Sequence, residues 1–130
     1  MRNKAKAIAF IIPLILLSAC IRQTVNIKTS VFDGYSYMEV WRASIRAVND
    51  IDYTVYSTDR DSGFIGAESG PYVFQELPPR LSIMIHDDIG RVYVECKIVQ
   101  MDQFIDVFGY GKKTVRRFMR SLNEHLRRAH

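Results

Sequence analysis

Two short stretches of the sequence contain residue types that could bind a metal ion or a phosphate group. Residues 86–88 are His-Asp-Asp. Adjacent side chains in a turn point in divergent directions, whereas a metal site needs convergent ligands with their own supporting hydrogen bonds. We therefore expect a solvated hairpin turn there and no metal site. Residues 109–114 are Gly-Tyr-Gly-Lys-Lys-Thr. A phosphate-binding loop would require Gly at Asp106 and Ser or Thr at Lys113, so we expect only a chain break before a helix.

Positive charge is concentrated at the C-terminal end of the sequence. Residues 112–130 carry seven Lys and Arg residues against one Glu, a net charge of +6, while residues 20–111 carry eight basic and thirteen acidic residues, a net charge of −5. This basic face is either only solvated or binds an anionic partner, which would be a lipid headgroup, a lipid A phosphate or an acidic protein. The candidate binding residues lie on one side of the expected helix: Lys113, Arg116, Arg117, Arg120 and Arg127.

The N-terminus has the layout of a secretory signal peptide. Arg2, Lys4 and Lys6 precede an apolar run over residues 7–17, which is about half the length of a membrane-spanning helix and contains Pro13. We expect residues 1–19 to be removed during export.

Residues 17–20, Leu-Ser-Ala-Cys, resemble the lipobox of bacterial lipoproteins. The resemblance implies cleavage before Cys20 and a covalent lipid on its sulfur, which would anchor the protein to a membrane without a second hydrophobic segment. In Gram-negative lipoproteins an Asp after the cysteine marks inner-membrane retention. Ile21 stands there instead, which favours the outer membrane, facing the periplasm.

Cys96 is the only thiol left once Cys20 is acylated, so we expect no disulfide. It alternates with apolar residues in the segment 92–98, which predicts a buried cysteine that acts as a small hydrophobic residue.

The spacing of apolar residues predicts two helices in a single domain over residues 35–130. The first is expected over 36–50, begun by Ser36 and Glu39 as a capping box. Trp41 lies in the middle of its apolar stripe. The second is expected over 112–128, with an apolar stripe opposite the basic face: Val115, Phe118, Met119, Leu122, Leu126 and Ala129.

Alternating apolar residues predict four strands in two hairpins. Residues 53–58 and 64–67 flank one turn, and residues 81–85 and 92–98 flank another at 86–90. The prediction is an α+β fold in the order α-β-β-β-β-α, with an antiparallel sheet of four to five strands and both helices packed on one face.

Three other segments are less well defined by their patterns. Residues 20–34 are expected to form the lipidated cysteine and a tether, with a short edge strand as the alternative. Residues 101–110 are ambiguous between a loop and a fifth strand. The loop 69–79 contains Tyr72, Val73 and Phe74, which either pack on the core or form a partner-binding surface.

Residues 36–68 resemble the globular domains of the C-type accessory lipoprotein of the outer-membrane β-barrel assembly machine. In both, a helix with a Trp near its start, here Trp41, leads into a strand and an acidic turn, here 59–63. A Gly followed by apolar residues then begins the next strand. The resemblance covers about a quarter of the chain and transfers no functional residue. It implies a helix-packed antiparallel sheet with a scaffolding role.

The expected function is that of a non-enzymatic envelope lipoprotein, an interaction or scaffold subunit of a membrane-associated complex. The alternative is a binding protein for an anionic envelope component, held by the basic C-terminal helix. Besides the covalent lipid we expect no cofactor. The expected partners are the membrane and other envelope proteins, without nucleic acid, and the oligomeric state stays open.

Overall fold

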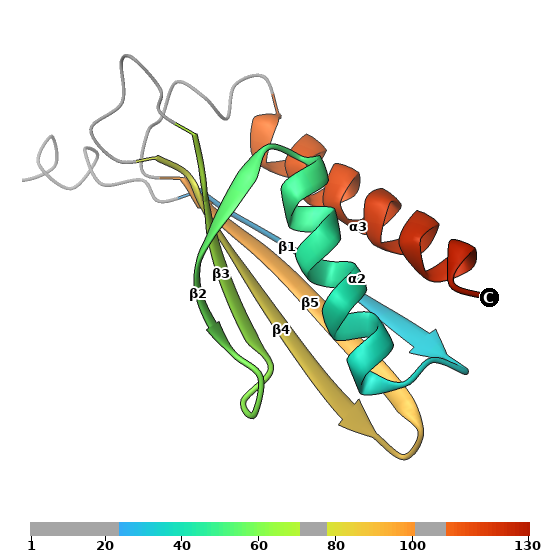
Figure 1. Cartoon of the computed structure of the whole chain (residues 1–130). Helices are drawn as coiled ribbons and strands as arrows, with labels where there is room; N and C mark the ends of the chain where they lie inside the picture. The colour runs from blue at the N-terminus through green and yellow to red at the C-terminus, as the bar shows by residue number, and fades with distance from the viewer. Residues whose placement is uncertain (1–23, 71–77, 101–108) are drawn as a thin grey trace, which may run out of the picture.

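The computed structural model describes residues 24–70, 78–100 and 109–130. Five antiparallel strands form one open sheet in the order β1-β5-β4-β3-β2, and both helices cover the same face of it (Figure 1). The α+β class is confirmed, and the order of elements after β1 matches the prediction. The elements are β1 (Thr24–Asp33), α2 (Tyr37–Asp50), β2 (Tyr53–Asp59), β3 (Phe64–Ser69), β4 (Arg80–Asp88), β5 (Arg91–Gln100) and α3 (Tyr110–Arg128).

The alternative of an edge strand within residues 20–34 is confirmed, and the tether prediction is wrong over residues 24–33. Residues 24–33 form β1, a ten-residue edge strand that pairs with β5 from Thr24 opposite Gln100 to Asp33 opposite Arg91. Residues 24–33 therefore belong to the domain, which was predicted to begin at residue 35. The sequence pattern did not predict this strand, because three of the four helix-facing side chains that the structure describes are polar, and only Phe32 of these enters the core.

The hairpins are confirmed, with one change of turn position. Strand β4 continues to Asp88, and the chain reverses at Ile89 and Gly90, both at positive φ. The predicted turn at 86–88 is therefore strand, in which successive side chains point to opposite faces. The His86 ring stacks on Tyr93 of β5, with centroids 4.9 Å apart.

The start of α2 confirms the capping box. The Ser36 hydroxyl accepts a hydrogen bond from the Glu39 N–H at 3.2 Å, and the Glu39 carboxylate accepts one from the Ser36 N–H at 2.7 Å. Trp41 is 7% exposed, and its ring stacks on the Tyr37 ring with centroids 6.2 Å apart. The two residues that form this cap are only three positions apart, so the sequence alone could predict where the helix begins.

Helix α3 begins at Tyr110, two residues earlier than predicted, so Gly111 lies in its first turn. A Cβ at position 111 would approach Asn26 Nδ2 of β1 to 2.6 Å and an Ile98 methyl to 3.2 Å. Glycine therefore allows the start of α3 to lie close to β1 and β5. The predicted apolar stripe is confirmed for five of its six members, each at most 4% exposed, whereas Ala129 is exposed because it lies beyond the last turn as the C-cap.

The core lies between the two helices and the inner face of the sheet. Ile65, Leu81, Ile83 and Ile98 are fully buried there. Cys96 is also buried, as predicted, and burial raises the pKa of its thiol far above the ordinary value. The thiol is therefore protonated and unreactive in the folded protein.

Candidate functional site

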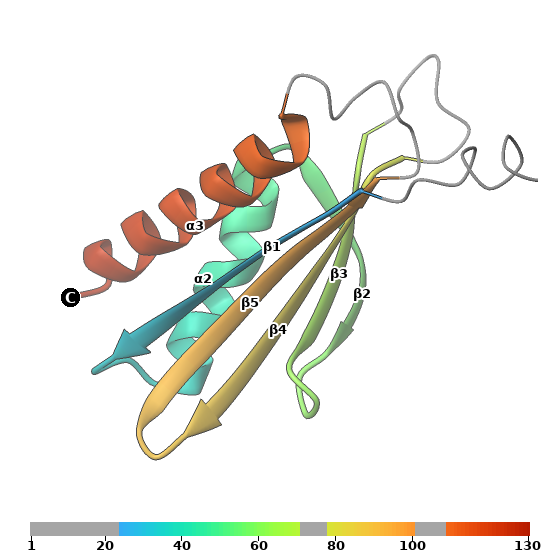
Figure 2. The same ribbon diagram turned by 180° about the vertical axis from the view of Figure 1, so that it is seen from behind.

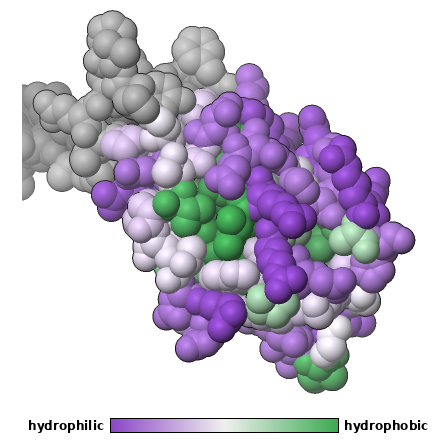
Figure 3. Space-filling view, in the orientation of Figure 1, coloured by the Kyte–Doolittle hydropathy of each residue, from purple (hydrophilic) through white to green (hydrophobic). Residues whose placement is uncertain are grey.

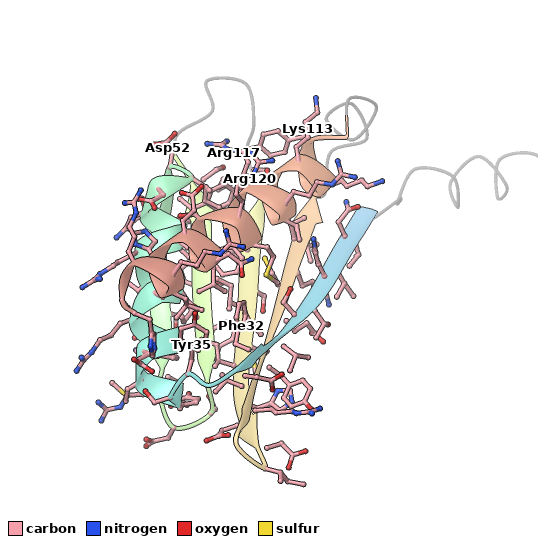
Figure 4. All side chains as sticks on the ribbon, turned by 90° about the vertical axis from the view of Figure 1, so that its right-hand side faces the viewer. Phe32, Tyr35, Asp52, Lys113, Arg117 and Arg120 are labelled. Atoms are coloured by element: carbon pink, nitrogen blue, oxygen red, sulfur yellow. The ribbon has the colours of Figure 1, made fainter. Side chains whose placement is uncertain are left out.

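The five predicted cations of α3 are all exposed. Within the described parts of the chain, no carboxylate lies within 4.0 Å of any of them. Figure 4 shows Lys113, Arg117 and Arg120 extending from α3, with Lys113 at its beginning. They do not form one uniform surface, because the two flanks of α3 face different neighbours.

On one flank, α3 and β1 enclose a cavity of about 420 Å³, here called the β1–α3 groove. Arg116 is the only predicted site residue there. Asn26 Nδ2 is buried and has no hydrogen-bond acceptor among the described residues. No carboxylate lines this groove, which is formed by Asn26, Ile27, Lys28, Lys112, Val115 and Arg116.

On the other flank, Arg117 and Arg120 lie among acidic groups. Arg117 lines a cavity of about 310 Å³ together with Asp52, and both arginines line one of about 210 Å³ with Asp50 and Glu124. The hydroxyls of Tyr53 and Tyr110 lie 3.3 Å apart at the first of these cavities. The acidic side chains on this flank offset the positive charge of the two arginines, so the flank attracts an external anion less strongly than the groove does. Neither Lys113 nor Arg127 lines any of these three cavities.

A Ser, an Asp and a His meet where α2 ends beside α3. Asp50 Oδ2 accepts hydrogen bonds from Ser121 Oγ at 2.6 Å and from His125 Nε2 at 2.6 Å. In a catalytic triad the histidine lies between the other two and takes the serine proton. Here the serine donates to the carboxylate, so the three residues tie the helices together and do not activate a nucleophile.

We expect this tie to make stability depend on pH through Asp50. The hydrogen bonds from Ser121 and then His125 hold the pKa of Asp50 below its ordinary value of 3.8. The folded protein thus binds this proton less readily than the unfolded chain, so the tie stabilises the fold above the unfolded pKa and is lost as the pH falls through the folded pKa. Asp50→Asn should unfold at lower urea than wild type at neutral pH, and the difference should shrink below about pH 4.

Ser121→Ala removes one of the two donors and should reproduce part of this pH-dependent difference in urea denaturation. A difference between wild type and Asp50→Asn that stays constant from neutral pH to about pH 3 would contradict the role given to the carboxylate.

The face of the sheet opposite the helices is uncovered. Figure 2 shows β1, β5 and β4 from this side with neither helix in front of them. The Tyr56 ring lies over Gly66 on this side, with Arg80 5.6 Å from its centroid. Five large apolar side chains, 37–58% exposed, define what we call the outer sheet face: Val25, Ile27, Val31, Tyr56 and Met84.

Other apolar surface lies elsewhere on the molecule. Figure 3 shows an apolar area between α2 and β2. Ile45 of α2 and Val55 of β2 pack on the core while staying partly exposed. Ile89, at the tip of the β4–β5 hairpin, is 96% exposed.

Several predicted features lie outside the described residues, namely Cys20, the signal peptide and the loop residues Tyr72, Val73 and Phe74. Within the described ranges, the structure has no group of three or more His, Cys, Asp or Glu side chains placed to hold a metal ion. Neither α2 nor α3 combines the length and the apolar character that crossing a bilayer requires.

Comparisons with known proteins identify the fold and no more. No family model matches the chain, and no curated protein matches it. The solved structure of Ara h 8.0201 is 7% identical with a TM-score of 0.57, over 81% of this chain and 95% of that one. Protein MLL2253 from Mesorhizobium loti is 9% identical with a TM-score of 0.59, over 84% of this chain and 99% of that one. At such identities the shared backbone fold carries no information about the site residues.

Proposed function

We propose that this protein is a lipid-anchored lipoprotein of the cell envelope whose domain is a non-enzymatic interaction subunit of a membrane-associated complex. The observation that carries the proposal is the outer sheet face. Five of the six exposed large apolar side chains of the described residues lie on it, and the sixth is Ile89. Three of the five, Val25, Ile27 and Val31, follow one another along the edge strand β1, and an exposed apolar row of this kind suits a protein–protein contact.

The N-terminal sequence supports the location. The basic start, the short apolar run and the lipobox at 17–20 favour lipid attachment through Cys20, and Ile21 favours the outer membrane, facing the periplasm. The similarity of residues 36–68 to the accessory lipoprotein of the β-barrel assembly machine supports a scaffolding role in such an assembly.

The partner that suits this surface is a protein that adds an extended strand to β1. Among the described strands β1 is an edge that pairs with β5 alone, so alternate backbone N–H and C=O groups point away from that sheet over its ten residues. Val25, Ile27 and Val31 extend from β1 on the outer sheet face at 41%, 58% and 47% exposure. An added strand would satisfy the backbone groups and let the partner's side chains cover these three.

Ile27→Lys is the direct test of this surface. A lysine at the centre of an apolar contact should cost at least about 2 kcal/mol, roughly a thirtyfold loss of affinity. We expect the partner that co-purifies with the wild-type lipoprotein from native membranes to be lost with this variant. In the wild-type complex, the amides of β1 should exchange with deuterium more slowly than in the isolated lipoprotein.

Ile89→Lys is the matched control, because it makes the same change at a more exposed isoleucine on the hairpin tip, and it should keep the partner. Retention of the partner by Ile27→Lys would contradict the proposed surface. A complex that contained only two copies of this chain would replace the foreign partner with a second copy.

A further inference from the structure

The β1–α3 groove is positively charged and its charge is not balanced from within. Lys28, Lys112 and Arg116 border it, and no carboxylate of the described residues lies within 4.0 Å of any of the three. Asn26 also lines the groove, and its Nδ2, buried where Gly111 of α3 approaches β1, has no acceptor among the described residues. Of the four polar side chains that line the groove, three can only donate hydrogen bonds. The chemical complement of such a set is an anion with several acceptor oxygens, as in a phosphate group.

We propose that this groove binds the phosphate of an anionic lipid headgroup in the same membrane that holds the anchor. The proposal rests on the proposed attachment through Cys20, and it adds a second, non-covalent contact with that membrane. The lipid on Cys20 would hold the protein on the membrane, and the groove would determine which end of the domain faces the headgroups.

The length of the chain places the groove next to the anchor. Four peptide units separate Cys20 from Thr24, and each spans about 3.8 Å between Cα atoms, so the two Cα atoms lie within about 15 Å of each other in any conformation. Asn26 follows two residues into β1, about 7 Å farther along the strand. The start of α3 lies at the same end of the molecule as the start of β1 (Figure 2). The groove is therefore within about 22 Å of the lipidated residue.

Charge distinguishes the groove from the other flank of α3. The ends of the domain do not differ in the same way, because the two hairpin turns at the opposite end carry two Asp and one Arg each, and Arg127 and Arg128 at the end of α3 balance them. The flank of α3 that faces α2 is a poorer site because Asp50, Asp52 and Glu124 lie among its cations.

Lysine footprinting on the mature lipoprotein tests the proposal. The protein is reconstituted in phosphatidylcholine vesicles with or without phosphatidylglycerol, its acyl chains are verified by mass spectrometry, and an amine-acetylating reagent is added. We expect Lys28 and Lys112 to be acetylated severalfold more slowly in the anionic vesicles, and the protection to weaken with added salt. Lys97, which extends from β5 on the uncovered side of the sheet, should react equally in both.

Paired variants remove the same charge from different places. With Lys112→Gln and Arg116→Gln together, the protection of Lys28 should disappear. With Arg120→Gln and Arg127→Gln, which take two charges from α3 outside the groove, it should remain. All four side chains are exposed, so the variants should keep the wild-type thermal melt, which circular dichroism checks.

Three results would overturn the proposal and are distinguishable. Equal rates for Lys28 in both vesicles, on protein whose Cys20 is acylated, would reject the headgroup site while leaving the anchor intact. Protection by inorganic phosphate in neutral vesicles, with none from phosphatidylglycerol, would assign the groove to a soluble phosphate. Unmodified Cys20 in the native protein would reject the anchor, and this proposal with it.

Discussion

Gly63→Ala is expected to destabilise the domain by about 3–5 kcal/mol, a large part of the stability of a typical small domain. Gly63 ends the β2–β3 turn at φ +81°, a conformation that costs an L-residue about 1 kcal/mol or more. A Cβ there would lie only 1.8 Å from the backbone carbonyl oxygen of Ile85. The turn would have to move away from β4 and lose the hydrogen bond from the Ile85 N–H to the Gly63 carbonyl, now 2.8 Å long.

Gly90→Ala separates the two causes. Gly90 has φ +73°, but a Cβ there would meet nothing within 4 Å. This variant should lose only the conformational part, about 1 kcal/mol. Urea denaturation monitored by Trp41 fluorescence measures both, and equal losses for the two variants would show that the close approach to β4 is not what requires glycine at 63.

Cys20→Ser is expected to abolish anchoring altogether. Each buried methylene contributes about 0.8 kcal/mol, so two or three acyl chains hold a protein on the membrane essentially permanently, and no described helix can replace them. We expect the variant as uncleaved precursor or as soluble protein, without acyl chains by mass spectrometry.

The buried Cys96 provides an independent measurement. Native lipoprotein should show no thiol that reacts with an alkylating reagent, and one per chain in denaturant, because the Cys20 sulfur is blocked. Cys96→Ala is the control that should keep the anchor and lose that thiol. Two reactive thiols in denaturant, or an unmodified Cys20 within an intact N-terminus, would contradict the lipoprotein assignment.

The sequence by itself determined the features whose cause is local. The capping box at Ser36 and Glu39 involves residues three apart, and the apolar stripe of α3 repeats at helical spacing, so both were predicted correctly. The two hairpins were visible for the same reason, because alternation and turn residues lie within a few positions of one another. Cys96 was placed in the core by its alternation with apolar neighbours.

Only the tertiary structure decided the features that depend on distant pairing. β1 is a strand because its backbone pairs with β5, 58 to 76 residues away in the sequence, and its polar helix-facing residues gave no apolar alternation by which to predict it. The same pairing brings Asn26 and Lys28 to Lys112 and Arg116, so the groove could not be predicted from the basic helix alone. Asp50 meets His125 across 75 positions in the same way. Short-range patterns specify elements, whereas the surfaces that could bind a partner arise where those elements meet.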